Sequence, residues 1–309
     1  MEDYNKILES LSVRFVKVNS LITSQTIEIK TLYDARNTLI VPYNGNTSFR
    51  QNGIRTAVKK GEILLIPGRE DISVTLGRGK GIFLDNEALE KNRKQYLDSY
   101  EIGTPIENEN AAAFLLITFE TKAFGSVNFF TALGIPTFIL DNAEISNIAA
   151  KIYNEASVVR TGNIRFANVL TEELTIQIFR YIIEKSLFVE QLATNMNYFK
   201  DPRLVKVFSF IKENLADDLS NKTLADVADV SEDYVGQYFK MLTSINPQDY
   251  IEYQRMERAV DLLRSSTKSI KDIGCEVGYK DTAYFCRRFK MMFGIPAGKM
   301  RRREALLGV

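Results

Sequence analysis

The stretch SIKDIGCEVGYKDTAYFCRRFKMMFG, residues 269–294, decides how the C-terminal part of this chain folds. Its apolar residues recur at helical spacing in two short segments that meet near Gly278. Ser269 is suited to cap the first segment, because its hydroxyl can accept a hydrogen bond from a backbone N–H that the first turn leaves unpaired. Gly278 can take the positive φ that a tight corner between two helices requires. The stretch therefore predicts a helix-turn-helix.

The same pattern occurs about fifty residues earlier, in LADVADVSEDYVGQYFK, residues 224–240. The offset between the two copies is 49 residues before the turn and 50 after it, so the second turn holds one extra residue. Ser220 is the expected cap of the first copy, and Asp229 takes the corner position at some strain. We therefore predict one helix-turn-helix over 220–241 and another over 269–291.

A connecting helix is predicted between the two copies. Asn246 is suited to cap it, and Pro247 fits its first position. From Pro247 to Arg264 this helix would span roughly 27 Å, somewhat less than the separation of about 34 Å between successive major grooves on one face of DNA. If the two helix-turn-helix modules are rigidly spaced, binding to successive major grooves would then need a small rotation of one module or a bend in the DNA.

The charge of the chain is divided unequally between the two copies. Residues 201–254 hold five lysines and arginines against ten aspartates and glutamates, a net charge of −5. Residues 255–309 hold 13 against six, a net charge of +7, although the whole chain has a net charge of only +1. The second module therefore carries the expected electrostatic contact with DNA, and the two halves of a binding site should be read unequally.

The outer face of each second helix supplies the candidate DNA-binding residues. In the second copy we expect Tyr284, Phe285 and Phe289 to pack inward. The residues then left outside are Thr282, Ala283, Cys286, Arg287 and Lys290. Arg287 is the best candidate to read a base, because a guanidinium can bind guanine through two hydrogen bonds, whereas Thr282 and Lys290 suit phosphates.

The corresponding outer face of the first copy is less basic. Its candidate DNA-binding residues are Ser231, Asp233, Gly236, Gln237 and Lys240. Gln237 could read adenine, but the acids beside it, Glu232 and Asp233, would repel phosphate. Whether this face reads bases is left open.

The N-terminal part has a different pattern. Residues 27–84 are rich in Val, Ile, Thr and Phe, and Asn52-Gly53 between alternating segments predicts a hairpin. Strands are expected over about 20–140, in a small antiparallel barrel or sandwich, and helices over about 141–193, the longer one at 163–193. We expect a sensor or dimerisation domain over 1–195, a linker over 196–203 and a DNA-binding domain over 204–309. The wide apolar face of 163–193 either packs on the sheet or makes a homodimer interface.

Composition excludes several classes of protein. The chain has no histidine and only two cysteines, so most metal sites, catalytic triads and disulfide frameworks are excluded, and we expect no metal or cofactor and no enzyme activity. No apolar run approaches the roughly 18 residues that span a bilayer, and the N-terminus lacks a secretory signal. We expect a soluble protein of the bacterial cytoplasm.

A family resemblance adds to this interpretation. SIKDIGCEVGYKDTAYFCRRFKMMFG resembles the second helix-turn-helix of the AraC/XylS family of bacterial transcription regulators, RMERAVDLL resembles its linker helix, and residues 224–240 resemble its first helix-turn-helix. GEILLIPG and LGIPTFIL are more weakly similar to its cupin-like sensor domain. The resemblance implies a multidomain α and β protein. It would have an N-terminal cupin-like antiparallel β-barrel with packed helices and a C-terminal all-α, homeodomain-like pair of helix-turn-helix modules.

The predicted function is sequence-specific regulation of transcription. The resemblance implies that the chain binds double-stranded promoter DNA and RNA polymerase, as activators of this family do, and answers a small organic effector. Arg50, Arg55 and Tyr43 could contact an effector but fit surface positions better. Two alternatives stay open: a cupin-type enzyme fused to a DNA-binding tail, and a regulator controlled by a protein partner with no small-molecule ligand.

Overall fold

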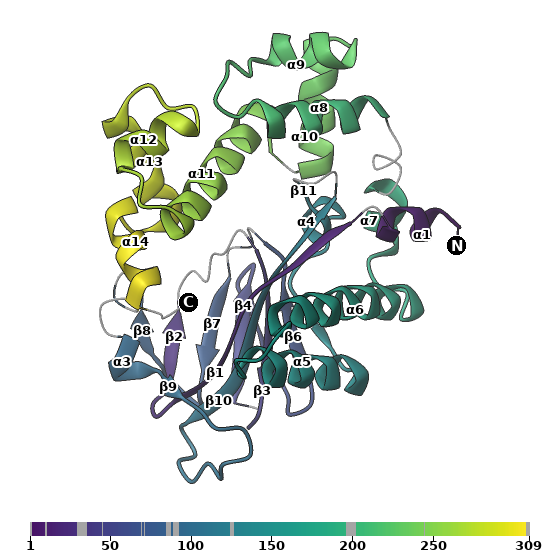
Figure 1. Cartoon of the computed structure of the whole chain (residues 1–309). Helices are drawn as coiled ribbons and strands as arrows, with labels where there is room; N and C mark the ends of the chain where they lie inside the picture. Colours follow the sequence, from purple (N-terminus) through teal and green to yellow (C-terminus); the bar gives the residue numbers. More distant parts are fainter. Residues whose placement is uncertain are drawn as a thin grey trace. The chain divides into compact units, whose positions relative to one another are not determined.

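The structure is a computed structural model that describes residues 2–9, 11–29, 36–44, 46–68, 70, 72–84, 88, 93–123, 127–195, 202–243 and 245–306. The chain divides into two compact units (Figure 1). One unit comprises residues 1–123 and 128–191, and the other comprises 192–309 with the segment 124–127. Of the linker expected at 196–203, residues 196–201 lie outside the described part of the chain.

Two sheets make up most of the N-terminal unit. The first has the strand order β12-β6-β3-β10-β1-β9, with β11 also paired to β10, and the second has the order β5-β4-β7-β2-β8. The strands are β1 (Ser12–Thr23), β2 (Ile27–Ile29), β3 (Asn37–Pro42), β4 (Thr47–Gln51), β5 (Ile54–Val58), β6 (Ile63–Ile66), β7 (Ser73–Leu76), β8 (Ile82–Leu84), β9 (Asp98–Ser99), β10 (Ala112–Ala123), β11 (Val127–Asn128) and β12 (Phe138–Leu140). Within these two strand orders, neighbouring strands are antiparallel except β2 and β8, which are parallel.

The two sheets share one hydrophobic core. Its members come from both, including Leu21, Ile40 and Phe114 of the first sheet and Phe49 and Val74 of the second. The expected fold class is confirmed in its β-rich N-terminal part with packed helices. In detail the described strands form two sheets rather than one closed barrel.

Local turn chemistry sets the hairpin of the second sheet. Asn52 and Gly53 join β4 to β5 with φ of 51° and 81°, the positive values that a two-residue hairpin turn requires. Asn and Gly are the residues that reach such values most easily, so the predicted hairpin is confirmed. The outer hairpin strand β5 is largely exposed, whereas β6 is buried along its length.

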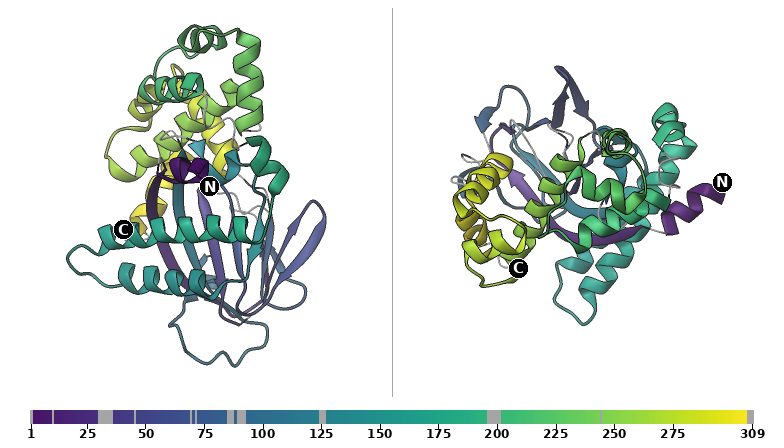
Figure 2. Two further views of the ribbon diagram at one scale, coloured as in Figure 1. Left: turned by 90° about the vertical axis from the view of Figure 1, so that its right-hand side faces the viewer. Right: turned by 90° about the horizontal axis from the view of Figure 1, so that it is seen from above.

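The helices of the N-terminal unit are α1 (Glu2–Glu9), α3 (Arg93–Tyr96), α4 (Phe129–Ala132), α5 (Ala143–Ala156) and α6 (Asn163–Glu184). Figure 1 and the left view of Figure 2 show α5 and α6 side by side across one face of the first sheet, where both contact β1. The helix predicted over 163–193 is wrong in its extent, because it breaks after Glu184. Ser186 and Phe188 take positive φ there, and the amide of Leu187 donates to the carbonyl of Ile182 at 2.9 Å, which closes the end of α6.

From Leu192 onward, the regular secondary structure of the described residues is helical. It contains α7 (Val189–Asn195), α8 (Pro202–Glu213), α9 (Asn221–Ala228), α10 (Glu232–Thr243), α11 (Pro247–Ser265), α12 (Ile270–Glu276), α13 (Thr282–Phe293) and α14 (Ala297–Leu306). α7 begins at the boundary, since residues 189–191 fall in the first unit. Among the described helices, none combines the length and the apolar character that crossing a bilayer requires.

The connecting helix α11 packs on both helix pairs. Near its start Tyr250 is buried against Phe208 of α8 and Phe239 of α10, at ring separations of 5.3 Å each. Toward its end Met256, Ala259 and Leu263 join the core of α12, α13 and α14. Asn246 accepts the amide of Asp249 and Pro247 occupies the first turn, so the predicted start of α11 is confirmed.

Candidate nucleic-acid interface

The two helix pairs α9–α10 and α12–α13 begin in the same way. The Ser220 hydroxyl accepts the amide of Thr223 at 3.2 Å, and the Ser269 hydroxyl accepts the amide of Asp272 at 3.1 Å. Both serines have φ −63° and ψ 157°. These are the caps that the spacing of the repeat predicts, and each satisfies an N–H that the first turn of a helix leaves free.

The corners of the two pairs are also equivalent. Asp229 and Gly278 have φ of 55° and 91°. In each pair the amide after the corner residue donates to the carbonyl five positions earlier, at 3.1 and 2.9 Å. This is a helix end with a left-handed residue just outside it, and the prediction of two corners with positive φ is confirmed.

One side of each second helix is buried. Val235 and Phe239 of α10 are buried, as are Phe285 and Phe289 of α13, which have no exposed surface. The expectation that Tyr284 packs inward is wrong, because 46% of its surface is exposed. Successive helical residues are about 100° apart, so with Phe285 at the centre of the buried side its neighbour turns toward solvent.

The opposite side of α13 is open. Asp281 caps the helix by accepting the amides of Ala283 and Tyr284. Of the five predicted DNA-binding residues, Ala283, Arg287 and Lys290 are exposed, and Thr282 and Cys286 are half-buried. The guanidinium of Arg287 lies 6.0 Å from the ring centre of Tyr284, one turn away. Tyr284 therefore belongs to this surface, a residue that its aromatic character led the sequence analysis to place in the core.

Arg287 and Arg288 are adjacent but have different surroundings. Arg288 donates to both carboxylate oxygens of Glu252 on α11, one of them at 2.5 Å from Nε. These hydrogen bonds raise the pKa of Arg288 above its ordinary value. Among the described residues Arg287 has no ion-pair partner. Of the two arginines, Arg287 is the one whose guanidinium is available for a ligand.

The open side of α10 carries the candidates of the first pair. Ser231 uses its hydroxyl to accept the amide of Tyr234 at 3.2 Å. Asp233, Gln237 and Lys240 are exposed and Gly236 is half-buried. The acids Glu232 and Asp233 lie in the first turn of α10, where a negative charge stabilises the helix. That stabilisation gives a structural reason for acids at a place where they oppose phosphate.

Gly236 has no packing reason to be glycine. A Cβ built on it meets nothing within 4 Å, and its φ does not lie in the left-handed region. Glycine inside a helix costs about 1 kcal/mol relative to alanine. The residue instead leaves the centre of the open side of α10 without a side chain.

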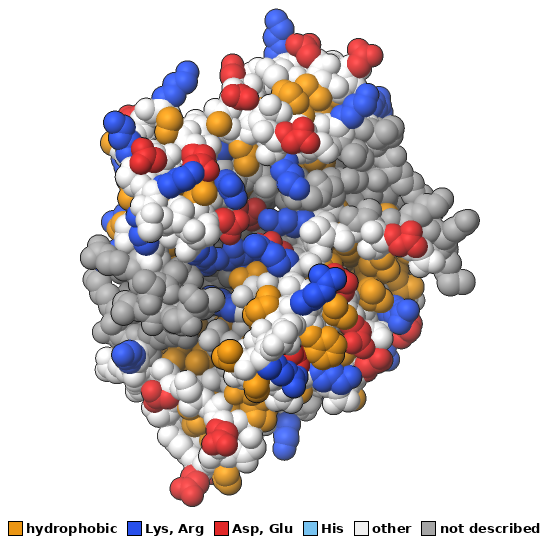
Figure 3. All heavy atoms as spheres, in the orientation of Figure 1, with side chains coloured by type: hydrophobic (Ala, Val, Ile, Leu, Met, Phe, Trp, Pro, Cys, Tyr) orange, Lys and Arg blue, Asp and Glu red, His pale blue; other side chains and the backbone are white. Residues whose placement is uncertain are grey.

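Basic and acidic side chains are interspersed on the C-terminal helices. In the space-filling view of Figure 3, blue and red side chains alternate over α8 to α13 on the face shown. The two helix pairs therefore differ in net charge and in the first turn of the second helix, which holds Glu232 and Asp233 in α10 and no acidic residue in α13.

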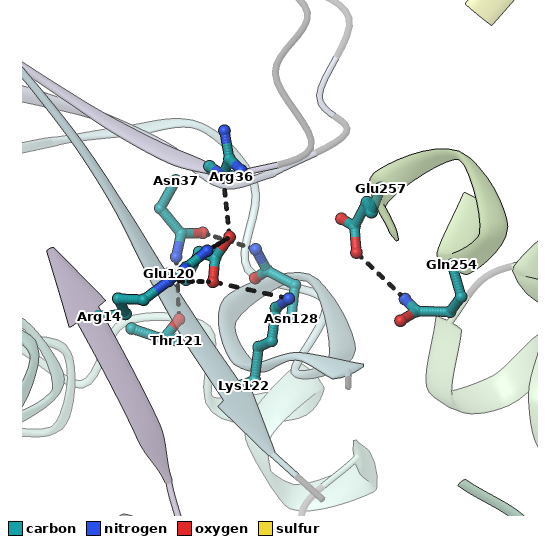
Figure 4. Close-up of polar contacts among 9 residues, drawn as sticks. All are labelled: Arg14, Arg36, Asn37, Glu120, Thr121, Lys122, Asn128, Gln254 and Glu257. Atoms are coloured by element: carbon teal, nitrogen blue, oxygen red, sulfur yellow. Dashed lines mark hydrogen bonds and ion pairs between the residues drawn. The ribbon is translucent and has the colours of Figure 1, made fainter. Parts of the chain in front are cut away.

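The N-terminal unit holds a cluster of charged residues that sequence reasoning missed (Figure 4). The carboxylate of Glu120 on β10 pairs with Arg14 at 3.1 Å, Arg36 at 2.8 Å and Lys122 at 3.6 Å. Burial alone would raise the pKa of Glu120, but Lys122 and the hydrogen bonds from the two arginines outweigh it and lower the pKa to about 2. Arg14 and Arg36 lie 106 and 84 residues from Glu120 in the sequence, so no local pattern signals that they meet it; only Lys122 is a neighbour on the same strand.

The sensor candidates differ in burial. Arg50 and Arg55 face one another across the β4–β5 hairpin and both are exposed, as expected. Tyr43 is half-buried, its hydroxyl is buried, and burial raises its pKa. Among the described residues no group of cysteine, aspartate and glutamate side chains is arranged to hold a metal ion.

Comparison with known sequences identifies the C-terminal region. Residues 224–303 match a family model described as a helix-turn-helix domain. The transcriptional activator RhaS of Enterobacter sp. strain 638 is 29% identical over 138 residues, which cover 44% of this chain and 48% of that protein. The transcriptional regulator MtrA of Neisseria gonorrhoeae is 20% identical over 172 residues, 55% of this chain and 57% of that protein. The chain spans about half the length of the curated relatives it matches.

Comparison with solved structures extends to both units. A single-substitution variant of apo ToxT from Vibrio cholerae strain SCE256 matches 95% of this chain and 97% of that one, with a TM-score of 0.55 and 10% identity. ToxT of the same strain with an unsaturated fatty acid bound matches 94% and 95%, with a TM-score of 0.52 and 11% identity. At this identity the likeness shows the fold, a β-rich N-terminal domain of two sheets followed by a helical domain.

Proposed function

The C-terminal part of this chain belongs to the AraC/XylS family of helix-turn-helix transcription regulators, and from that premise we propose that the whole protein binds promoter DNA and regulates transcription. One observation carries the proposal: two helix pairs with equivalent caps and corners each present an open helix side, α10 and α13. Such a side is what enters a major groove.

We propose that α13 and α10 contribute unequally to DNA affinity. On α13 the exposed Arg287 is the base reader, and Lys290 and Thr282 bind phosphate with Ala283 and Cys286 in the same groove. On α10, Ser231, Gly236, Gln237 and Lys240 face the DNA beside Asp233, whose charge opposes phosphate. The second pair therefore supplies most of the affinity.

A binding selection from random duplex DNA tests this proposal. The full chain should enrich one sequence, and Arg287→Ala should relax the choice at one base pair and cost about 1–3 kcal/mol of discrimination there. The matched control is Arg258→Ala, an exposed arginine on α11. Failure of the wild-type chain to enrich any sequence would refute the proposed function, and an unchanged preference in Arg287→Ala would refute the role of that residue alone.

The N-terminal unit is proposed to bind a small organic effector. Two observations support an apolar ligand: the hydrophobic core shared by the two sheets, and the fold likeness to ToxT, which has been solved with an unsaturated fatty acid bound. Thermal unfolding of the full chain with an unsaturated fatty acid as the probe tests it. A ligand at a hundred times its dissociation constant adds about 2.7 kcal/mol to the free energy of unfolding. No stabilisation by any acid of a chain-length series would favour control by a protein partner.

A homodimer through α6 is proposed within the predicted interface 163–193. Along α6, Phe166, Val169, Glu173, Ile176, Arg180 and Ile183 follow one another at alternating steps of three and four residues. Its apolar members are 36–51% exposed. Antiparallel pairing of two copies about Ile176 places Glu173 of one copy beside Arg180 of the other, which makes this face complementary to itself.

Sedimentation of charge variants tests the dimer. Glu173→Arg and Arg180→Glu should each shift the equilibrium toward monomer, and the double variant should restore the dimer. A wild-type chain that stays monomeric at high concentration would contradict the proposal without bearing on DNA binding.

The remaining features of the proposed function follow from the family. The relatives named above are transcriptional regulators, and we assign this chain no enzyme activity and no cofactor. Contact with RNA polymerase and action in the cytoplasm, where a bacterial promoter lies, are part of the same proposal. The full chain should not turn over the substrates of cupin-type enzymes. Turnover would favour the alternative, a cupin-type enzyme fused to a DNA-binding tail.

A further inference from the structure

We propose that Arg255 of α11, with Gly278 and the carbonyls of Leu215 and Asp217, forms a joint that locks the two helix-turn-helix modules at one separation and rotation. Arg255 is thereby a positioning residue for DNA recognition. This inference rests on the proposed function and deepens it, because Arg255 would fix the spacing and rotation at which the two modules meet DNA.

The first half of the joint ties α11 to the first module. Arg255 Nε donates to the carbonyl of Leu215, and its Nη2 donates to the carbonyl of Asp217, each at 2.8 Å. These carbonyls follow the end of α8, whose Phe208 packs on Phe239 of α10. A guanidinium suits this place because its several N–H groups can donate to two backbone carbonyls that lie outside any helix.

The second half ties the same guanidinium to the second module. The Arg255 Cζ atom lies 5.9 Å from the ring centre of Tyr279, the residue after the corner of α12–α13. A Cβ placed on Gly278 would lie 2.7 Å from the Leu215 carbonyl oxygen and 2.9 Å from Arg255 Cζ. Gly278 is therefore required for close approach of the two modules as well as for its φ of 91°.

A second set of contacts braces the joint one turn earlier on α11. Glu252 accepts a hydrogen bond from the Tyr279 hydroxyl at 3.3 Å and holds Arg288 of α13 through both oxygens. The second module is thus held by two residues of α11 at its corner and on its recognition helix. Neither the corner nor the recognition helix of the second module can rotate about α11 without breaking charged hydrogen bonds, which are about twice as strong as neutral ones.

Rigid spacing has a consequence for DNA. Since the joint fixes the separation and rotation of the two modules, α10 and α13 can both reach DNA only where their two segments have one spacing. Changing the spacing between the segments should therefore be costly.

The experiment measures spacing selectivity on the DNA sequence that the wild-type chain selects. Two base pairs are inserted between the two contacted segments, which rotates one by roughly 70° relative to the other. The wild type should lose affinity steeply. In Arg255→Ala the penalty for insertion should shrink by about tenfold, the equivalent of one lost charged hydrogen bond. Arg255→Lys should resemble Arg255→Ala, because one ammonium cannot bridge two carbonyls and stack on Tyr279.

Arg258→Ala is the matched control, since it removes one positive charge from the same helix and should keep the insertion penalty. A direct readout uses two spin labels, at Lys222→Cys on α9 and Lys271→Cys on α12, in a full chain with Cys275→Ser and Cys286→Ser. The wild-type distance distribution should be narrow and that of Arg255→Ala broad. An unchanged penalty and an unchanged width would overturn the joint, while leaving DNA binding by the wild type intact. If Arg255→Ala fails to fold, Arg255→Lys carries both measurements.

Discussion

Glu252 on α11 binds Arg288 on α13 through both oxygens of its carboxylate. The neighbouring Arg287 has no such partner among the described residues and lies 6.0 Å from the Tyr284 ring centre. Two adjacent arginines of one helix therefore have separate tasks, because an acid 36 residues earlier in the chain meets only one of them.

Glu252→Gln should lower the free energy of unfolding of the C-terminal region by about 1–2 kcal/mol, because it weakens a partly exposed charged pair. Urea unfolding followed by circular dichroism suits a chain without tryptophan. A double-mutant cycle with Arg288→Met isolates the pair, and a coupling energy near zero would contradict it.

Asp229→Gly should stabilise the protein by about 0.5–1 kcal/mol, because glycine takes the left-handed conformation at φ 55° without strain. The equivalent change in the second pair has the opposite sign. Gly278→Ala should destabilise the protein, because its Cβ would collide with the Leu215 carbonyl oxygen and because alanine rarely adopts a φ of 91°. Thermal unfolding of both variants tests these predictions. Stability changes in the same direction for the two variants would contradict them.

Gly236→Ala separates stability from DNA binding. The substitution should stabilise α10 by about 0.5–1 kcal/mol, because nothing lies within 4 Å of the new Cβ. If the open side of α10 lies against DNA, the added methyl group should lower affinity for the selected sequence. A variant that gains stability and keeps full affinity would remove α10 from close contact with DNA.

Glu120 makes the stability of the N-terminal unit depend on acid pH. Its pKa is lowered from 4.5 to about 2, so the stabilisation is complete above pH 4.5 and is lost as the pH falls through about 2. Glu120→Gln should be less stable than the wild type at neutral pH, and the difference should shrink between about pH 4.5 and 2. Denaturant midpoints across this range test the sign, and a constant difference would contradict it.

Sequence alone determined the duplicated helix-turn-helix, its caps at Ser220 and Ser269, its corners at Asp229 and Gly278 and the hairpin at Asn52-Gly53. These features depend on residues a few positions apart, whose conformational preferences act locally. The buried positions of Phe285 and Phe289 followed from the same short-range periodicity.

Only the tertiary structure decided the rest. It separated the tasks of Arg287 and Arg288, turned Tyr284 outward, broke the helix predicted over 163–193 after Glu184 and divided the strands between two sheets. It also gave Gly278 a second role, close contact with the carbonyl of Leu215. Each of these depends on which distant residue comes within hydrogen-bonding or packing distance, and such a partner leaves no periodic pattern in the sequence.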